Sequence, residues 1–365
     1  MKFKTVKEKI LNAVLLAERI VGKKESLPVL SCVLIDVGKE CVIRATNLEA
    51  GLETTVPCTV DERGVIAVPA TILSQTLRSL GADTVMFSIE ESNLLIQSRG
   101  TKTLIKATPH DEFPSFSSAV SRGGIPIARE RFIHGLQAVS YAASPSMMRP
   151  ELGSVFITIK SGKLVVVATD SFRLAEKTVL DIGSKEELEL LVPLRHVLEL
   201  LHVLERVDED VVQLVVDDSQ LVVSGGGTRY TSRIVDAAFP NYREIVPKST
   251  TTEATILKND FAEVLRKARV FSGGEQHVGF HVYPKKKLFT ATARSNDVGE
   301  MSDSIDAALS GEDLDINFHV GYLADCLSSI ESDSIVLAFS GPGKPLVIRG
   351  VSDTSFMYLV MPLNR

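Results

Sequence analysis

The chain has 365 residues, of which 44% are hydrophobic and 24% charged, and its formal net charge is −6. This length predicts two to four domains, each able to bury its own core, and no apolar run reaches the roughly 18 residues of a membrane-spanning helix. Residues 1–5 have neither the apolar core nor the cleavage site of a signal peptide, so we expect a cytosolic protein.

Three apolar segments end in the same dipeptide. Ala45-Thr46, Ala168-Thr169 and Ala291-Thr292 recur at equal intervals of 123 residues. Intervals of a third of the chain predict a triplicated domain, since solenoids and propellers repeat at about 20–50 residues. Asn47 or Asp170 follows in the first two copies, and such a residue ends a strand and shapes a turn. We therefore expect each Ala-Thr dipeptide to close a strand.

Each third of the chain has the same order of elements. A helix with one apolar stripe comes first, at residues 7–21, 132–143 and 261–268. A hairpin follows, with period-two strands such as residues 154–160. A second helix begins near residues 71, 195 and 322, in two cases after a proline that suits the first turn of a helix, and a last hairpin ends each third. The expected fold class is α+β, with two helices packed on antiparallel sheets in every repeat.

Polar or glycine-rich segments separate the thirds. Gly123-Gly124 and residues 249–252 are poor in core residues and are typical of linkers. We therefore expect three domains, at residues 1–122, 125–248 and 253–365.

Positive charge gathers on the first helix of each third. With the loop that follows, residues 5–24 carry a net charge of +3, and residues 127–149 and 257–271 carry +2 each, which leaves −13 for the rest of the chain. Basic helices on an acidic body suit a protein that holds the phosphate backbone of DNA on one surface. The alternative is that these side chains are merely solvated helix faces. Zinc-finger, leucine-zipper and RNP patterns are absent, so any DNA binding should ignore sequence.

Catalytic and metal-binding patterns are weak or absent. Residues 341–345 end in proline where a phosphate-binding loop needs Ser or Thr, and residues 224–227 fit a hairpin turn better. His277 and His281 lie in strand-like sequence, where a spacing of four does not make a helical metal pair. We predict no catalysis, no metal and no cofactor. The cysteines form no CxxC pair and are expected to be buried and reduced: Cys32, Cys41, Cys58 and Cys326.

Five short motifs spread over the whole chain carry a family resemblance. They are residues 1–3 (Met-Lys-Phe), 27–30 (Leu-Pro-Val-Leu), 168–175 (Ala-Thr-Asp-Ser-Phe-Arg-Leu-Ala), 239–247 (Phe-Pro-Asn-Tyr-Arg-Glu-Ile-Val-Pro) and 358–363 (Tyr-Leu-Val-Met-Pro-Leu). In this order and spacing they resemble the bacterial DNA polymerase III beta subunit, the beta sliding clamp.

The resemblance implies three clamp domains per chain and a head-to-tail homodimer closed into a ring, with sheets outside and helices lining the hole. Double-stranded DNA would pass through the hole, held by phosphate contacts that allow sliding. The implied function is a processivity clamp without catalysis, which tethers the replicative polymerase and so raises its effective concentration at the primer end. Two alternatives are a scaffold that does not encircle DNA and a clamp paralogue kept for drug resistance or a specialised polymerase.

Members of this family bind short linear peptides of polymerases, the clamp loader and repair proteins between the second and third domains. Mostly apolar positions with one arginine match that pocket here, which suits an apolar peptide anchor. They are Leu152, Thr169, Ser171, Phe172, Arg173, Leu174, Pro240, Ile245, Leu359, Val360, Met361, Pro362 and Leu363. Glu244 and the tail Asn364-Arg365 depart from some relatives, and both positions bear on peptide preference.

The resemblance also implies contacts to DNA and between protomers. The DNA-facing positions are basic residues of hole-lining loops and of a second-domain helix: Lys24, Arg149 and Arg195. At the ring interface, Val270 and Phe271 would meet the strand around Thr103 and Ile105 of the other protomer. Thr103 replaces an aromatic residue of some relatives, which predicts a weaker or differently packed interface.

Overall fold

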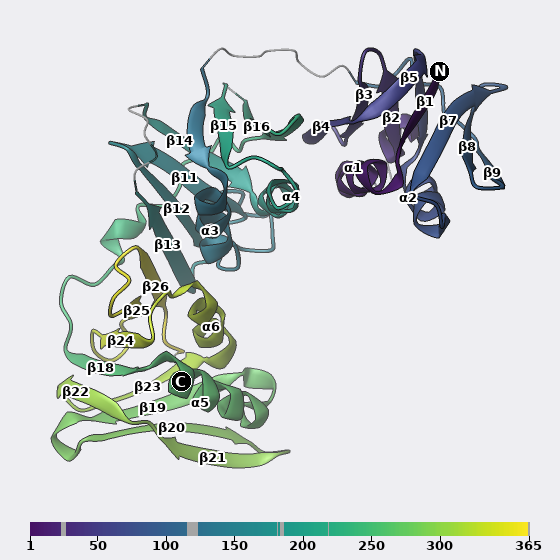
Figure 1. Cartoon of the computed structure of the whole chain (residues 1–365). Helices are drawn as coiled ribbons and strands as arrows, with labels where there is room; N and C mark the ends of the chain where they lie inside the picture. The colour runs from purple at the N-terminus through teal and green to yellow at the C-terminus, as the bar shows by residue number, and fades with distance from the viewer. Residues whose placement is uncertain (23–26, 115–122, 181, 183–185, 218, 364–365) are drawn as a thin grey trace. The chain divides into compact units, whose positions relative to one another are not determined.

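The computed structural model describes residues 1–22, 27–114, 123–180, 182, 186–217 and 219–363 (Figure 1). It divides into two compact units, residues 1–130 with 195–234 and residues 131–194 with 235–365. No helix among the described residues is long and apolar enough to cross a membrane. The α-helices are α1 (Lys7–Ile20), α2 (Ala70–Ser79), α3 (Arg129–Ser140), α4 (Leu194–Leu204), α5 (Lys258–Phe271) and α6 (Val320–Asp325).

The first unit contains two antiparallel sheets. Its strands are β1 (Lys2–Val6), β2 (Cys32–Val37), β3 (Cys41–Thr46), β4 (Ala50–Val56), β5 (Cys58–Glu62), β6 (Gly64–Pro69), β7 (Thr84–Glu90), β8 (Asn93–Ser98), β9 (Thr101–Ile105), β10 (Ile125–Ala128), β15 (Val211–Val216), β16 (Gln220–Gly225) and β17 (Thr228–Arg233). The sheet orders are β5-β1-β7-β8-β9 and β10-β15-β16-β17-β4-β3-β2-β6. The glycine-rich residues 224–227 form the β16–β17 hairpin, as predicted.

The second unit also contains two antiparallel sheets. Its strands are β11 (Ser154–Lys160), β12 (Lys163–Thr169), β13 (Arg173–Val179), β14 (Leu188–Pro193), β18 (Thr252–Leu257), β19 (His277–Tyr283), β20 (Leu288–Ser295), β21 (Gly299–Ser304), β22 (Ala307–Gly311), β23 (Leu314–His319), β24 (Ser334–Phe339), β25 (Leu346–Gly350) and β26 (Phe356–Val360). The sheet orders are β14-β11-β12-β13-β26-β25-β24-β18-β22 and β21-β20-β19-β23. His277 and His281 lie on β19, which confirms their predicted strand.

The first helix of each repeat buries the apolar stripe seen in the sequence. In α5 the buried residues are Phe261, Val264, Leu265 and Ala268, at the three- and four-residue spacing of one helix face. In α1 the buried face contacts α2, β3 and β4, and Figure 1 draws these elements together. The single-stripe prediction is confirmed, and most side chains on the other face of these helices are polar.

The second helices begin differently from the sequence prediction. Pro69 ends β6 and is the N-cap of α2, and Pro193 ends β14 just before α4. Both prolines therefore precede the helix instead of lying in its first turn. In the third repeat His319 takes this place, and its Nδ1 accepts a hydrogen bond from the backbone N–H of Tyr322 at 3.3 Å. A side-chain cap thus replaces proline.

Two strand pairings join consecutive repeats. β4 of the first repeat pairs with β17 of the second, and β13 of the second pairs with β26 of the third. Each of the two largest sheets therefore runs through a junction between repeats, and main-chain hydrogen bonds hold that junction together.

The third Ala-Thr dipeptide does not close a strand, so this prediction is wrong. β20 continues beyond Thr292 to Ser295. In the other copies Asn47 or Asp170 follows the threonine and accepts hydrogen bonds within the turn. Ala293 follows Thr292, and its methyl group cannot accept such bonds, so the strand continues.

One cysteine is less buried than expected. Cys32, Cys41 and Cys326 are buried free thiols, whereas Cys58 is half-buried. Cys58 begins β5, an edge strand with a neighbouring strand on one side only, so its side chain has less cover.

Candidate functional site

The turn between β12 and β13 is held by its own side chains. Thr169 Oγ1 donates to the carbonyl of Arg173 at 2.6 Å. Asp170 Oδ1 accepts from the backbone N–H groups of Phe172 at 2.9 Å and Arg173 at 3.0 Å. Ser171 takes the left-handed conformation, with φ +79°. This fixed turn leaves the Phe172 side chain 61% exposed.

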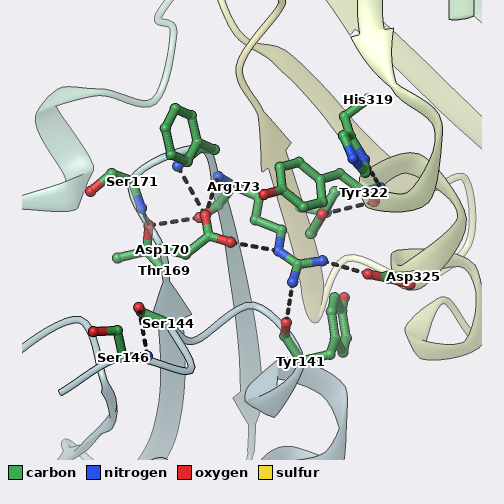
Figure 2. A network of polar contacts seen from close by, with 12 residues as sticks. Tyr141, Ser144, Ser146, Thr169, Asp170, Ser171, Arg173, His319, Tyr322 and Asp325 are labelled. Carbon is green, nitrogen blue, oxygen red and sulfur yellow. Dashed lines mark hydrogen bonds and ion pairs between the residues drawn. The ribbon is translucent and has the colours of Figure 1, made fainter. Parts of the chain in front are cut away.

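The guanidinium of Arg173 is the centre of the polar network in Figure 2. Its Nε donates to Asp170 at 2.9 Å, its Nη2 to the backbone carbonyl of Tyr141 at 2.6 Å, and its Nη1 to Asp325. The side chain is only 12% exposed. Burial opposes its charge, but Tyr358, Asp325 and Asp170 together outweigh burial and raise the pKa of Arg173. Arg173 therefore links the turn to α3 and α6 as a permanent cation.

Tyr322 contacts both Arg173 and His319. The guanidinium carbon lies 4.3 Å from the Tyr322 ring centroid, a cation–π distance, and the His319 ring centroid also lies 4.3 Å from it. Burial, and next the charge of Arg173, lower the pKa of His319, which favours the neutral ring that caps α6. Sequence reasoning did not find Tyr322, His319 or Asp325. The one available signal was the histidine at the place where the other copies have proline.

The structure gathers most predicted pocket residues at the β13–β26 pairing. Leu174 pairs with Leu359, and the Met361 N–H donates to the Phe172 carbonyl at 2.8 Å. Burial sorts the set into three groups. Buried are Leu152, Thr169, Leu174, Leu359 and Val360; half-buried are Arg173, Pro240, Met361 and Pro362; exposed are Ser171, Phe172, Ile245 and Leu363. A ligand at the surface would meet the exposed group first.

An apolar cluster fixes the loop at residues 239–247 to the sheet. Leu174 and Leu359 belong to this cluster together with Tyr242. Phe239 stacks on Phe156 with ring centroids 4.8 Å apart. The loop is therefore a packed wall beside the pairing, and Ile245 stands on it with its side chain 51% exposed.

The last described residues run beside β23. The Leu363 N–H donates to the carbonyl of Asn317 at 2.8 Å. A cavity of 340 Å³ adjoins this segment, lined by His281, Asp315, Ile316, Asn317, Pro342, Gly343, Pro362 and Leu363. Asn364 and Arg365, which bear on peptide preference, lie outside the described residues, so that expectation stays a prediction.

A basic groove of 1110 Å³ lies among α1, α2 and α4 in the first unit, and four arginines and three glutamates line it: Arg19, Arg78, Arg195, Arg206, Glu18, Glu49 and Glu199. Arg195, predicted to face DNA, lines it and donates to Glu199 at 3.0 Å. Burial raises the pKa of Glu199, although Arg195 and a hydrogen bond from Tyr230 oppose that shift. Arg19 also lines the groove and belongs to the first basic helix predicted from the sequence. Sequence reasoning missed Arg78 and Arg206, because elements distant in sequence bring them together with Arg19 and Arg195.

The two other predicted DNA-facing residues belong to loops. Arg149 lies in the second unit, where its side chain is 63% exposed and its Nε donates to Glu151 at 2.9 Å. Lys24 lies outside the described residues, so its role stays a prediction.

The residues predicted at the ring interface lie on or near edge strands. β9 is an edge of the five-stranded sheet. Along it Thr103 is half-buried, Ile105 is 4% exposed and Leu104 is 52% exposed, so the strand turns Leu104 outward, a residue that sequence reasoning missed. At the end of α5, Val270 is 61% exposed and Phe271 is half-buried.

Three family models cover nearly the whole chain. They describe the DNA polymerase III beta subunit: its N-terminal domain at residues 1–117, its central domain at 126–241 and its C-terminal domain at 243–364. The chain belongs to the DNA polymerase III beta subunit family. This confirms the resemblance and the prediction of three clamp domains with mixed helix and sheet.

Relatives of this family match over the full length. The beta sliding clamp of Pseudomonas aeruginosa is 26% identical and that of Bacillus subtilis 23%, with 100% of both chains covered in each case. The crystal structure of the DNA polymerase III beta subunit from Thermotoga maritima is 26% identical, has a TM-score of 0.93 and covers 100% of this chain and 99% of that one. The role of this chain is that of a sliding clamp, a processivity factor of replication, as predicted. The scaffold and paralogue alternatives are not favoured.

Proposed function

We propose that this chain closes with a second copy into a head-to-tail ring around double-stranded DNA. The observation that carries the proposal is the pairing between its repeats. In both junctions, the strand after the Ala-Thr segment of one repeat pairs with the last strand of the next repeat: β4 with β17, and β13 with β26.

Among the described residues, the same pattern of pairing leaves one strand of the third repeat and one strand of the first repeat without a junction partner, so these two strands could pair between copies. β21 follows the Ala-Thr segment of the third repeat, and β9 is the last strand of the first repeat. Both are edges among the strands of the described residues, and an open edge is a template for pairing with another chain. Joining β21 of one copy to β9 of the next continues the series head to tail, and two copies would close a ring of six domains.

Charge supports pairing between these two different edges. Lys102 and Lys106 are exposed on and beside β9, whereas β21 carries Glu300 and Asp303. Opposite charges across the new pairing would attract, and two copies of the same edge would repel. Thr103, Ile105, Val270 and Phe271 would lie at this interface, as the family implies.

Contacts to DNA would come from the basic groove and the loops. Four arginines line the groove in the first unit, and Arg149 is exposed in the second. Guanidinium groups bind phosphates without reading bases, which permits sliding. We infer that Arg195, Arg149 and Lys24 face the DNA.

We infer that partner peptides bind at the β13–β26 pairing. The exposed apolar groups of Phe172, Ile245 and Leu363 stand on a frame fixed by strand pairing and apolar packing, and such a surface suits an apolar peptide anchor. Arg173 is already held by three acceptors, so its contribution is to fix the turn. The polymerase alpha subunit, the clamp loader and repair proteins would be tethered here, which raises their effective concentration on DNA.

The domains extend over residues 1–122, 125–248 and 253–365, because polar segments separate the repeats there. The chain catalyses no reaction of its own, since its distinctive geometry consists of strand edges and surfaces for binding. It works in the bacterial cytoplasm, where its polymerase partners replicate DNA.

The decisive experiment is loading by a clamp loader onto nicked circular DNA, followed by linearisation. A ring held by topology slides off the cut DNA, whereas retention on linear DNA with open ends would overturn the encirclement. Mass in solution is the simpler check, because a 39.7 kDa monomer at micromolar concentration would contradict the closed ring.

A further inference from the structure

We propose that the junction between the first and second repeats contains a second linear-peptide site, which takes a peptide with acidic side chains. The inference rests on the proposed function, because it treats the β13–β26 surface as a peptide site. The same kind of strand pairing builds two junctions in this chain: β4 with β17, and β13 with β26.

The turn between β3 and β4 has the same hydrogen bonds as the turn between β12 and β13. Thr46 Oγ1 donates to the Ala50 carbonyl at 2.8 Å and accepts from the Leu48 N–H at 3.0 Å. Asn47 Oδ1 accepts from the N–H groups of Glu49 at 3.0 Å and Ala50 at 2.7 Å. Leu48 has φ +73°, where Ser171 has +79°. The two turns therefore present their central side chains in the same way.

The strand beside each turn is also attached alike. The Arg233 N–H donates to the Glu49 carbonyl at 2.8 Å, and the Met361 N–H donates to the Phe172 carbonyl at 2.8 Å. Glu49 therefore stands in the first junction where Phe172 stands in the second, and Arg233 stands where Met361 does.

The first two residues of the wall at 239–247 have counterparts in the first unit. Phe113-Pro114 corresponds to Phe239-Pro240, and Phe113 packs on a buried cluster that includes Leu34, as Phe239 packs on Phe156. Pro114 lines the resulting cavity. The turn, the paired strand and the Phe-Pro start of the wall therefore occur a second time, within the first unit.

Three positions of the second site are polar where the first site is apolar, whereas at the centre of the turn the apolar Leu48, 55% exposed, replaces Ser171. Glu49 replaces Phe172, Arg233 replaces Met361, and Thr231, which pairs with Gly51, replaces Leu359. Leu48, Ala50 and Pro114 supply the apolar part of the lining, and its charged groups come from Glu49, Arg229 and Arg233. Arginine and hydroxyl donors suit a carboxylate, since an arginine fork matches its two oxygens.

The cavity has room for a side chain and not for a larger ligand. Its volume is 220 Å³, below the roughly 300–1,000 Å³ of pockets for drug-sized molecules, and its lining includes Thr46, Glu49, Gln220, Arg229 and Arg233. Arg233 pairs with Glu49 at 3.2 Å, but both side chains are more than half exposed. Such pairs are weak, about 0–1 kcal/mol, so an incoming carboxylate can displace Glu49.

A peptide fits this site better than nucleic acid does. The cavity of 220 Å³ admits one charged side chain at a time, whereas a nucleic acid carries a phosphate on every nucleotide. A peptide presents one carboxylate at a time, with neutral backbone on either side.

The test uses a fluorescent hexapeptide that alternates glutamate and glycine, and its glutamine–glycine counterpart, at low ionic strength. We expect the full-length dimer to bind the acidic peptide, and Arg233→Gln to weaken binding at least tenfold. Glu49→Gln should tighten binding two- to fivefold, because it removes the competing carboxylate. Arg266→Gln is the matched control and should change nothing, since Arg266 is 75% exposed and pairs with Glu263 at 3.8 Å.

Three results would overturn the inference: no binding of the acidic peptide, equal loss with Arg266→Gln, or a six-residue oligothymidylate that binds with the same dependence on Arg233. A parallel titration with an apolar hexapeptide tests the β13–β26 pocket by itself. Apolar binding without acidic binding rejects only the second site, and acidic binding alone rejects only the first. Thermal midpoints of the exposed-site variants confirm that each is folded.

Discussion

The ammonium of Lys177 lies 3.5 Å from a carboxylate oxygen of Asp353, and these side chains are only 8% and 9% exposed. Lys177 stands on β13 of the second repeat, and Asp353 precedes β26 of the third. Asp353 also accepts from the Ser355 N–H at 2.9 Å. The pair therefore adds a buried charge interaction to the main-chain junction between these repeats.

Replacing the buried ammonium should destabilise the second unit. Lys177→Met leaves the Asp353 carboxylate buried without its cation, and loss of one partner of a buried pair costs about 3–5 kcal/mol. Because hydrogen bonds to Asp353 remain, we expect about 2 kcal/mol, a fall of roughly 4–8 °C in the thermal midpoint. Lys163→Met, at an exposed position on β12, is the control and should stay within about 0.5 kcal/mol. Equal effects of the two changes would refute a stabilising pair.

The buried carboxylate of Glu199 should make stability rise on mild acidification. Burial raises its pKa above the ordinary value of 4.5, despite Arg195 and Tyr230. A carboxyl group with a raised folded pKa binds its proton more tightly in the folded state, so its contribution is fully present below pH 4.5 and is lost as pH rises through the folded pKa. We expect Glu199→Gln to have the higher thermal midpoint at pH 7.

The difference in thermal midpoint between Glu199→Gln and the parent protein reports the titration of Glu199 alone. It should shrink as pH falls through the raised folded pKa of Glu199 toward 4.5, because other carboxylates titrate alike in both proteins. Glu205→Gln, at a half-exposed position near the end of the same helix, should show no such convergence. A constant difference between the two curves at all pH values would contradict the raised pKa.

The parts of the site that could be read from the sequence are those with local chemistry. A threonine followed by Asn47 or Asp170 encodes its turn through bonds to its own backbone, so both turns were predictable. The prediction for the third repeat was wrong because Ala293 has no side-chain acceptor to form the turn, so β20 continues. On β9 the alternation of a strand places Leu104 on the opposite face from Thr103 and Ile105. Only the packing of the sheet decides which of the two faces meets solvent.

The parts that could not be read depend on contacts distant in sequence. Arg173 has a motif of its own, yet its partners Tyr322 and Asp325 come from α6, about 150 residues later. Tyr322 and Asp325 are spaced as residues of any short helix are, so the sequence of α6 does not indicate that it contacts an arginine. The basic groove is similar, because its arginines come from α1, α2, α4 and the turn that follows α4.

The register of the proposed β9–β21 pairing follows from the junctions within the chain. Ala50 pairs with Ser232 in the first junction. The hairpin registers show which residues are equivalent in different repeats. Met301 of β21 is the equivalent of Ala50, and Ile105 of β9 is the equivalent of Ser232. Met301 should therefore lie opposite Ile105 of the other copy.

One residue along, Leu104 should lie opposite Ser302 of the other copy. We expect Leu104→Cys with Ser302→Cys, in a chain that also carries Cys58→Ser, to form a disulfide-linked dimer on a non-reducing gel. Neither single variant should link to itself, because the interface joins different edges. Lys102→Cys with Ser302→Cys is the offset control, since diagonal partners lie about 7–8 Å apart, beyond disulfide reach. A link formed by Leu104→Cys alone would contradict the head-to-tail arrangement.

Deleting residues 361–365 should abolish binding of an apolar partner peptide and leave the dimer intact. The deletion removes the Met361 bond to Phe172 and the exposed Leu363, but it leaves the β9 and β21 edges unchanged. A milder change tests the surface itself: Leu363→Ser should weaken binding by about fivefold, or about 1 kcal/mol of apolar contact. Leu288→Ser, equally exposed at 37% against 38%, is the control. Anisotropy of a labelled peptide and sedimentation of the dimer measure the two properties separately, and unchanged peptide affinity after the deletion would place the peptide site elsewhere on the chain.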